Sequence, residues 1–353
     1  MIVYLIMLAL SLFFAVYAQN TKPYPALKNS YQLLAFLAAV PFVFVSVFRD
    51  QVGVDWNLIY APYYYYINNG IDQFREIGFV LLNRLLYLFT EDSWILFAVV
   101  GFFTNCILFT AIFQQSDSAP WSIFLYFLLS YYFASLNQIR QMLAMSMFLY
   151  SLKYVYSREF WKYEACILFA TLFHLSSLMY IPVYFIYSLR MNYKQRILLF
   201  LACVMCLPVL RIVIVALVSL TSYGWYFESE FLQNDFYLLG FLVHFVYMAV
   251  HIFYQWRSEK RKEEDTLLDF YNSMILFATV LMLFSAVIPQ VQRVAEGFSV
   301  VLIFGMPRML KSEPNAQLRL VTVAGMVAMI LAKFLFDTYI NAWHGALPYQ
   351  FVF

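Results

Sequence analysis

Long apolar runs, separated by short polar breaks, fill most of this chain. An α-helix needs ~20 predominantly apolar residues to cross a bilayer, and many of the runs approach that length. Membrane spans are predicted near residues 2–17, 33–48, 94–113, 121–136, 142–156, 197–220, 236–254, 271–288, 298–309 and 320–336. The pattern therefore predicts an all-α, polytopic integral membrane protein.

Two further apolar segments are ambiguous. Residues 79–89 form a short run that carries Arg84, so they predict either a thin span or a helix at the membrane interface. Residues 162–190 are too long for one upright helix and contain Pro182, so they form either one tilted span or a hairpin. We favour the interface helix and the hairpin, which give about ten to twelve crossings in one transmembrane domain over residues 1–353.

Composition supports this class. Of 353 residues, 64% are hydrophobic and 12% are charged, whereas soluble domains average about 45–50% apolar and about 25% charged residues. A water-soluble fold could not bury so much apolar surface. The formal net charge is only +2, with Lys and Arg dispersed among the loops, so nucleic acid is not an expected partner.

Orientation follows from the distribution of Lys and Arg, because short cytoplasmic loops are enriched in them. The basic residues that we place in the cytoplasm are Lys22, Lys28, Arg190, Lys194, Arg196, Arg257, Lys260, Arg261, Lys262, Arg308, Lys311 and Arg319. One cytoplasmic loop covers residues 257–269. The segments that we place on the outer face are 49–76, 221–235, 289–297 and 337–353.

The sequence lacks the motifs of several common classes of enzyme. Gly-rich phosphate loops, His-Glu-x-x-His and Gly-x-Ser-x-Gly are absent from the sequence, which gives no support to ATP hydrolysis, zinc proteolysis or serine hydrolysis. The four cysteines, Cys106, Cys166, Cys203 and Cys206, fall inside apolar runs, where cysteine acts as a small hydrophobic residue. No metal or other cofactor is expected.

Three arginines are predicted on or near the outer face, although Arg is biased toward the cytoplasm: Arg49, Arg140 and Arg293. A guanidinium presents a fixed fork of donors that matches phosphate oxygens and stays charged in a low-dielectric setting. The group therefore indicates a site for a lipid diphosphate. Alternatively, each arginine reaches the interface for solvation, or pairs structurally with Asp55 or Glu76.

Three side chains are candidates for a base that accepts a proton from a sugar hydroxyl: Asp55, Glu76 and His174. His174 also fits a hydrogen-bonded packing residue within a helix. Trp56 and the tyrosines of segment 49–76 could stack on sugar rings, but aromatic residues are expected at every membrane interface.

The polar positions form a recognisable series. It runs through Arg49, Val52-Gly53-Val54-Asp55, Tyr60, Glu76-x-Gly78-Phe79, Asn137-x-x-Arg140-Gln141-x-x-Ala144, Phe173-His174-x-Ser176-Ser177, Arg293 and Pro348-Tyr349. In this order, over nearly the whole chain, the series resembles the EpsG family of bacterial membrane proteins. That family is similar to the Wzy-type polymerases of O-antigen and other surface polysaccharides.

The resemblance implies a reaction and a fold. A glycan on undecaprenyl diphosphate would be transferred to a lipid-linked repeat unit at the outer face of the bacterial inner membrane, within a helical bundle of the GT-C kind and without a metal. A flippase and a chain-length regulator would be functional partners.

The resemblance also implies roles for the matched residues. Arg140 and Arg293, with Arg49, would hold the diphosphate, and Gln141, Tyr60 and Tyr349 would complete the substrate site. Asp55, Glu76 or His174 would orient or deprotonate the acceptor hydroxyl.

Other functions fit part of the pattern. A transporter or flippase of lipid-linked oligosaccharide would also combine many spans with an arginine-lined cavity, but its polar residues should extend through both halves of the membrane. A membrane O-acyltransferase would use His174 in a deeper funnel. A structural subunit of a synthesis complex is a further alternative.

Overall fold

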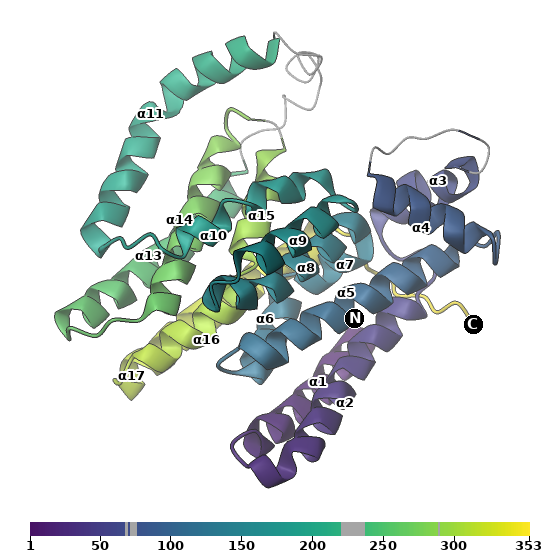
Figure 1. Ribbon diagram of the computed structural model, residues 1–353, viewed down its shortest axis with the longest axis horizontal. Coiled ribbons are helices and arrows are strands. Elements are labelled where there is room, and N and C mark those ends of the chain that lie inside the picture. Colours follow the sequence, from purple (N-terminus) through teal and green to yellow (C-terminus); the bar gives the residue numbers. More distant parts are fainter. Residues whose placement is uncertain (68–69, 71–75, 220–236, 289) are drawn as a thin grey trace. The chain divides into compact units, whose positions relative to one another are not determined.

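The computed structural model describes residues 1–67, 70, 76–219, 237–288 and 290–353, and all regular elements in these ranges are helical (Figure 1). The predicted all-α class is confirmed. The chain divides into two compact units: unit 1 is Met1–Tyr184 with Arg319–Phe353, and unit 2 is Phe185–Leu318. The predicted outer segment 221–235 lies outside the described residues, and the assignment of one transmembrane domain stays a prediction.

Unit 1 contains the helices that carry most of the predicted site. They are α1 (Ile2–Thr21), α2 (Lys28–Val47), η2 (Trp56–Tyr60), α3 (Ala61–Tyr66), α4 (Ile77–Tyr87), α5 (Trp94–Gln115), α6 (Ala119–Leu128), α7 (Tyr131–Asn137), α8 (Ile139–Tyr156), α9 (Phe160–Thr171), η4 (Leu175–Tyr180) and, from Arg319 onward, α17 (Ala316–Leu335). Contacts connect α1 to α2, α2 to α5, α5 to α8 and α8 to α9 (Figure 1).

The predicted span 121–136 is a bent pair of helices. α6 and α7 meet at an angle of 55°, and Ser130 at the break has a left-handed φ of 66°. A second break follows at once, because α7 ends at Asn137 and α8 begins at Ile139. The second break places Asn137 at the end of α7 and Arg140 at the start of α8.

The segment 162–190 doubles back, as a hairpin requires. α9 ends at Thr171, η4 begins at Leu175, and the two elements pack against each other. The hydroxyl of Tyr163 near the start of α9 donates to the carbonyl of Tyr180 at the end of η4, over 2.6 Å. His174 therefore lies in the turn of a hairpin, which is the alternative that we favoured for this segment, and not within a helix.

Unit 2 is built from α11 (Tyr193–Ser219), α13 (Leu238–Lys260), α14 (Thr266–Phe284), α15 (Val291–Ser299) and α16 (Leu302–Ser312). Ion pairs connect the loops that we predicted to share the cytoplasmic face. Arg257 Nε lies 2.7 Å from Glu313 Oε2, and Arg308 Nε lies 2.8 Å from Asp265 Oδ2. These basic loops of unit 2 therefore lie at one end of the unit, as predicted.

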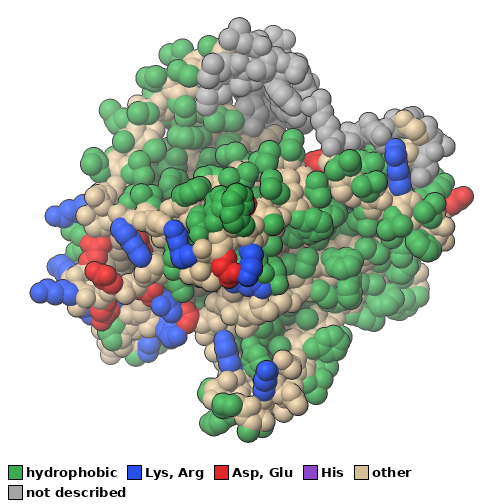
Figure 2. Space-filling view, viewed as in Figure 1, with side chains coloured by type: hydrophobic (Ala, Val, Ile, Leu, Met, Phe, Trp, Pro, Cys, Tyr) green, Lys and Arg blue, Asp and Glu red, His purple; other side chains and the backbone are tan. Residues whose placement is uncertain are grey.

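Among the described helices, seven are long and apolar enough to cross a membrane, or eight if the bent pair counts as one span. The number differs from the predicted ten to twelve because some apolar runs are divided or too polar. Residues 298–309 fall on two short helices, and α8 carries Arg140, Gln141 and Lys153. Hydrophobic side chains cover much of the face shown in Figure 2, and many large hydrophobic side chains are exposed, as expected for a multi-pass membrane protein.

Candidate active site

The carboxyl-terminal tail pairs with the segment that follows α2. The Asp50 amide donates to the Gln350 carbonyl over 3.0 Å, and the Val352 amide donates to the Phe48 carbonyl over 3.0 Å. Further along, the Gly53 amide donates to the carbonyl of Gly345 over 3.1 Å. Two segments that we assigned to the outer face, 49–76 and 337–353, therefore meet at one end of unit 1.

The same segment packs on the break between α7 and α8. Gly53 has a φ of +115°, and a Cβ at this position would lie 2.5 Å from the carbonyl oxygen of Leu136. Only glycine combines that φ with so close an approach. The Asp55 amide then donates to Asn137 Oδ1 over 2.7 Å, which fixes the half-buried Asp55 beside the start of α8.

Arg49 is completely buried against a pair of stacked aromatic rings. Its guanidinium carbon lies 5.7 Å from the ring centroids of both Trp56 and Phe97, and none of its three side-chain nitrogens has a hydrogen-bond partner among the described residues. Burial lowers the pKa of Arg49 to about 10, although the hydroxyls of Tyr132 and Tyr4, among others, partly oppose the shift. The protein therefore holds a cation without compensating hydrogen bonds.

Tyr349 anchors the tail close to Arg49. Its hydroxyl donates to the carbonyl of Val45 over 2.9 Å, and its ring meets that of Tyr4 edge to face at 5.4 Å. Burial raises the pKa of Tyr349. The Tyr349 hydroxyl thus binds the protein backbone, and its contact with substrate stays a prediction.

Arg140 forms the centre of a second, more accessible group. Its Nη1 lies 2.9 Å from Glu76 Oε2, and the two side chains retain 15% and 12% exposure. Nε of Arg140 donates to the Tyr60 hydroxyl over 3.5 Å, and its guanidinium carbon lies 5.4 Å from the Phe79 ring centroid. Aromatic rings and one carboxylate thus fix Arg140 while part of it remains reachable.

His174 lies on the other side of Glu76. Its Nδ1 is 4.0 Å from Glu76 Oε1, and the Leu175 amide donates to the same oxygen over 3.5 Å. The start of α4 docks at this turn, since a Cβ on Gly78 would lie 2.7 Å from the Leu172 Cβ. The close approach places Glu76, the residue before α4, beside the hairpin turn.

The structure thus brings together four of the predicted side chains, Glu76, Arg140, His174 and Tyr60. Arg49 is connected to these four side chains through one buried aromatic cluster. The cluster contains Trp56, Tyr60, Phe79 and Phe97. The aromatic cluster separates the two arginines from each other and contacts both.

Two further predicted residues, Gln141 and Arg293, lie on α8 and α15. Gln141 is buried on α8, next to Arg140. Arg293 lies on α15 of unit 2, where its side chain is exposed, and its membership in the site stays a prediction. Sequence reasoning missed Phe97 and Tyr4, because each lies in an ordinary apolar run that gives no signal of its neighbours.

The group can bind an anion and move a proton. Arg140 supplies a charged donor. Glu76 and His174 lie 4.0 Å apart, so proton exchange between them needs one intervening water or a closer approach. In the part of the chain that the structure describes, no three His, Cys, Asp or Glu side chains are arranged to hold a metal ion.

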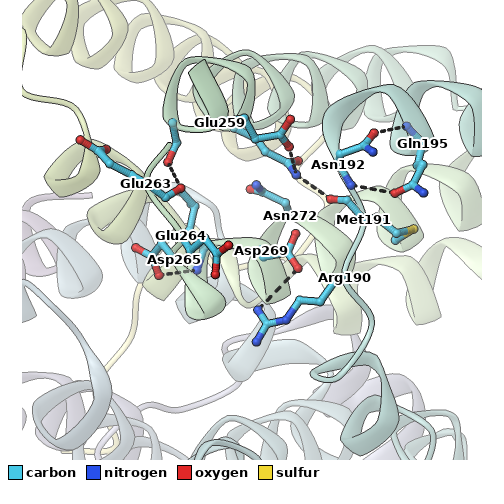
Figure 3. Close-up of a pocket in the computed structure, with 13 residues that line it drawn as sticks. Arg190, Met191, Asn192, Gln195, Glu259, Glu263, Glu264, Asp265, Asp269 and Asn272 are labelled. Carbon is cyan, nitrogen blue, oxygen red and sulfur yellow. Dashed lines mark hydrogen bonds and ion pairs between the residues drawn. The ribbon is translucent and has the colours of Figure 1, made fainter. Parts of the chain in front are cut away.

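Unit 2 contains a separate polar pocket of about 450 Å³ (Figure 3). Acidic side chains line it, but arginines neutralise several of them: Asp269 pairs with the buried Arg196 and lies 3.8 Å from Arg190, and Asp265 pairs with Arg308. These pairs connect α11, α14 and α16. The acidic side chains of the pocket therefore have a structural role, since their ion pairs connect helices of unit 2.

Comparison with known proteins yields one match. The model of the EpsG family matches residues 32–351, nearly the whole chain. No curated protein and no solved structure matches this sequence.

Proposed function

The chain belongs to the EpsG family, which is associated with polysaccharide polymerases, and from this premise we propose that it polymerises a bacterial surface polysaccharide. In the proposed reaction, a growing glycan moves from undecaprenyl diphosphate to a lipid-linked repeat unit at the outer face of the inner membrane. One observation supports it most: Arg140, Glu76 and His174 converge from three separate elements.

Each member of this group has a chemical role in the transfer. The acceptor hydroxyl attacks the anomeric carbon of the donor glycan, and the bond from that carbon to the phosphate oxygen breaks. The electron pair leaves on undecaprenyl diphosphate, whose negative charge Arg140 stabilises. Glu76 accepts the hydroxyl proton, and His174, 4.0 Å from Glu76, passes the proton on to solvent.

Arg49 contributes differently, because its side chain has no exposed surface. A positive charge behind the aromatic cluster raises the electrostatic potential at the Arg140 end of the cluster, because the apolar rings between the two arginines screen the charge less than water would. We therefore assign Arg49 to charge stabilisation at a distance, and Arg140 to direct contact with the diphosphate. Asp55, held beside α8 by Asn137, orients the acceptor.

A cellular experiment tests the proposal. Surface polysaccharide is resolved on a gel from cells that lack the native gene, complemented with wild type or with Arg140→Ala at equal membrane abundance. We expect wild type to restore long polymer, and Arg140→Ala to leave acceptors that carry a single repeat unit. Glu91→Gln, an exposed carboxylate change outside the group, serves as the matched control and should restore long polymer.

Two results would overturn the proposal. If the deleted strain shows no surface repeat unit and accumulates the lipid-linked unit inside, the protein is a flippase. If Arg140→Ala restores long polymer as well as wild type does, the site is wrongly placed.

A further inference from the structure

An apolar groove of about 390 Å³ lies between α5, α8 and α9 of unit 1. Cys106 and Ile107 of α5, Met147 of α8, and Cys166 and Phe169 of α9 contribute to its wall. The volume falls in the ~300–1,000 Å³ range of small-molecule sites. It is therefore large enough for part of a ligand that enters from the membrane.

The groove is continuous with the aromatic cluster that holds Arg140. Ile107 and Met147 line the groove and also pack against that cluster. Phe169, on the opposite wall, contacts the Phe173 ring at a centroid distance of 5.5 Å, and Phe173 also packs against the cluster. A ligand in the groove can therefore reach the polar group without leaving the protein surface.

Helix geometry gives the direction of this path. Met147 follows Arg140 on α8 by two turns, so the two positions share one helix face at a separation of roughly 10 Å. On α9 the chain runs the other way, and Phe169 precedes the turn that holds His174. Arg140 and His174 thus lie at the same end of the groove.

The wall is predominantly apolar. Two of its residues carry hydroxyls: Thr110, which donates to the Cys106 carbonyl over 2.7 Å, and Tyr150 of α8. The thioether of Met147 and the ring of Phe169 present an irregular, adaptable apolar surface. Such an adaptable apolar surface can accept a methyl-branched chain.

We propose that this groove binds the first isoprene units of a polyprenyl diphosphate whose headgroup contacts Arg140. The inference rests on the proposed function and deepens it, because it places the lipid half of the substrate. The apolar wall stabilises the chain by burial, and the cationic group binds the diphosphate. Selection of the lipid carrier therefore comes from both parts together.

The groove carries its own reporters, since Cys106 and Cys166 are free thiols in its wall. We would place the full chain with Cys203→Ser and Cys206→Ser in phosphatidylcholine nanodiscs and measure labelling by a lipophilic maleimide. Added undecaprenyl diphosphate should slow labelling about tenfold when about nine-tenths of the protein is occupied, because only the empty groove reacts. Phosphatidic acid at the same mole fraction should not.

A matched control reports on the membrane itself. In the converse variant, with Cys106→Ser and Cys166→Ser, the maleimide reacts with Cys203 and Cys206 of α11. Undecaprenyl diphosphate should leave that labelling rate unchanged. Three results would overturn the proposed binding of isoprene units in the groove. They are equal protection of both cysteine pairs from the maleimide, equal protection by phosphatidic acid, and no protection by undecaprenyl diphosphate.

A second variant tests the groove during turnover. Cys166→Phe fills the groove and should raise the KM for the lipid-linked substrate about tenfold while kcat stays near wild type. Cys206→Phe, at an exposed position on α11, should change neither constant. An unchanged KM in Cys166→Phe would contradict the inference.

The labelling measurement separates this inference from the proposed function, because it needs no turnover. Protection in a protein that makes no polymer would overturn the polymerase proposal and support the groove. Polymer formation without protection of the cysteines would support the polymerase proposal and overturn the proposed lipid groove.

Discussion

The guanidinium of Arg140 and the carboxylate of Glu76 form an ion pair with Nη1 2.9 Å from Oε2. The pair joins the second residue of α8 to the residue that precedes α4, and it stays partly exposed beside His174. A structural ion pair has no need of that exposure, whereas a site that binds substrate does.

The first prediction concerns this pair. Glu76→Gln keeps one of the two oxygens that accept from Arg140 and from the Leu175 amide, and it removes the base. We expect kcat to fall about 10²-fold or more, with the thermal midpoint of unfolding little changed. Rates of repeat-unit transfer and a detergent-solubilised melting curve provide the measurement, and Glu91→Gln provides the control. Wild-type kcat in Glu76→Gln would remove Glu76 from the chemistry.

The second prediction separates function from stability at Arg49. A buried cation without hydrogen bonds opposes folding, and replacing such a group by an apolar one of similar volume is often neutral or stabilising. Arg49→Met should therefore keep or raise the melting temperature while transfer activity falls at least about tenfold.

The Arg49 experiment needs a measure of folding and one of activity in the same preparation. If Arg49→Met lowers the melting temperature and activity in parallel, the arginine has a structural role at the tail and no role in charge stabilisation. Arg49→Lys should not restore activity, since an ammonium lacks the planar guanidinium that packs against the stacked rings of Trp56 and Phe97.

The third prediction tests the contact that places the outer segment on α7. Gly53→Ala adds a Cβ that would lie 2.5 Å from the Leu136 carbonyl oxygen, at a φ of +115°. Strain and overpacking together should lower the free energy of unfolding by about 2 kcal/mol or more. Gly325→Ala is the matched control, because a Cβ there meets nothing within 4 Å. Similar melting temperatures for the two variants would contradict the close approach.

The fourth prediction concerns pH. Burial, with a smaller effect of the Lys333 charge, lowers the pKa of His344 in the tail to about 4, below the ~6.5 of an exposed histidine. Between these values the undocked tail binds the proton more strongly, so docking should weaken as pH falls from about 6.5 toward 4. Above about pH 6.5 the stability of docking should not depend on His344.

Hydrogen exchange measures that equilibrium. The amides of Asp50 and Gly53 donate to tail carbonyls, so their protection, corrected for intrinsic rates, should decrease on acidification through this range. His344→Gln should flatten the dependence. Protection that rises on acidification in the wild type would reverse the sign and contradict the argument.

Much of the fold follows from apolar periodicity alone. The runs at 2–17, 33–48 and 94–113 became α1, α2 and α5 with boundaries close to those predicted. The breaks were harder to predict. The bend at Ser130 and the restart at Ile139 lie in a mostly apolar stretch, and tertiary contacts with Gly53 and Asp55 accompany them.

The site was predictable where polar residues interrupt apolar runs. Arg140, Glu76 and His174 stand out for that reason, and the structure brings them together. Pairing of an arginine with Glu76 was one of the alternatives that the sequence offered, and Arg140 forms that pair. The stacking of Phe97 on Trp56, at a centroid distance of 3.4 Å, was not predictable, because Phe97 looks like any other residue of α5. A single sequence shows which residues are unusual, whereas packing decides which of them meet.

The most direct test of the account is transfer by the purified protein. The full chain is reconstituted with a defined undecaprenyl-diphosphate-linked repeat unit and without nucleotide sugar, and oligomer length and released undecaprenyl diphosphate are measured by chromatography. The account predicts oligomers with one undecaprenyl diphosphate released for each new linkage, and no product with Arg140→Ala. Failure of the folded wild-type protein to consume the substrate, or equal rates for wild type and Arg140→Ala, would contradict it.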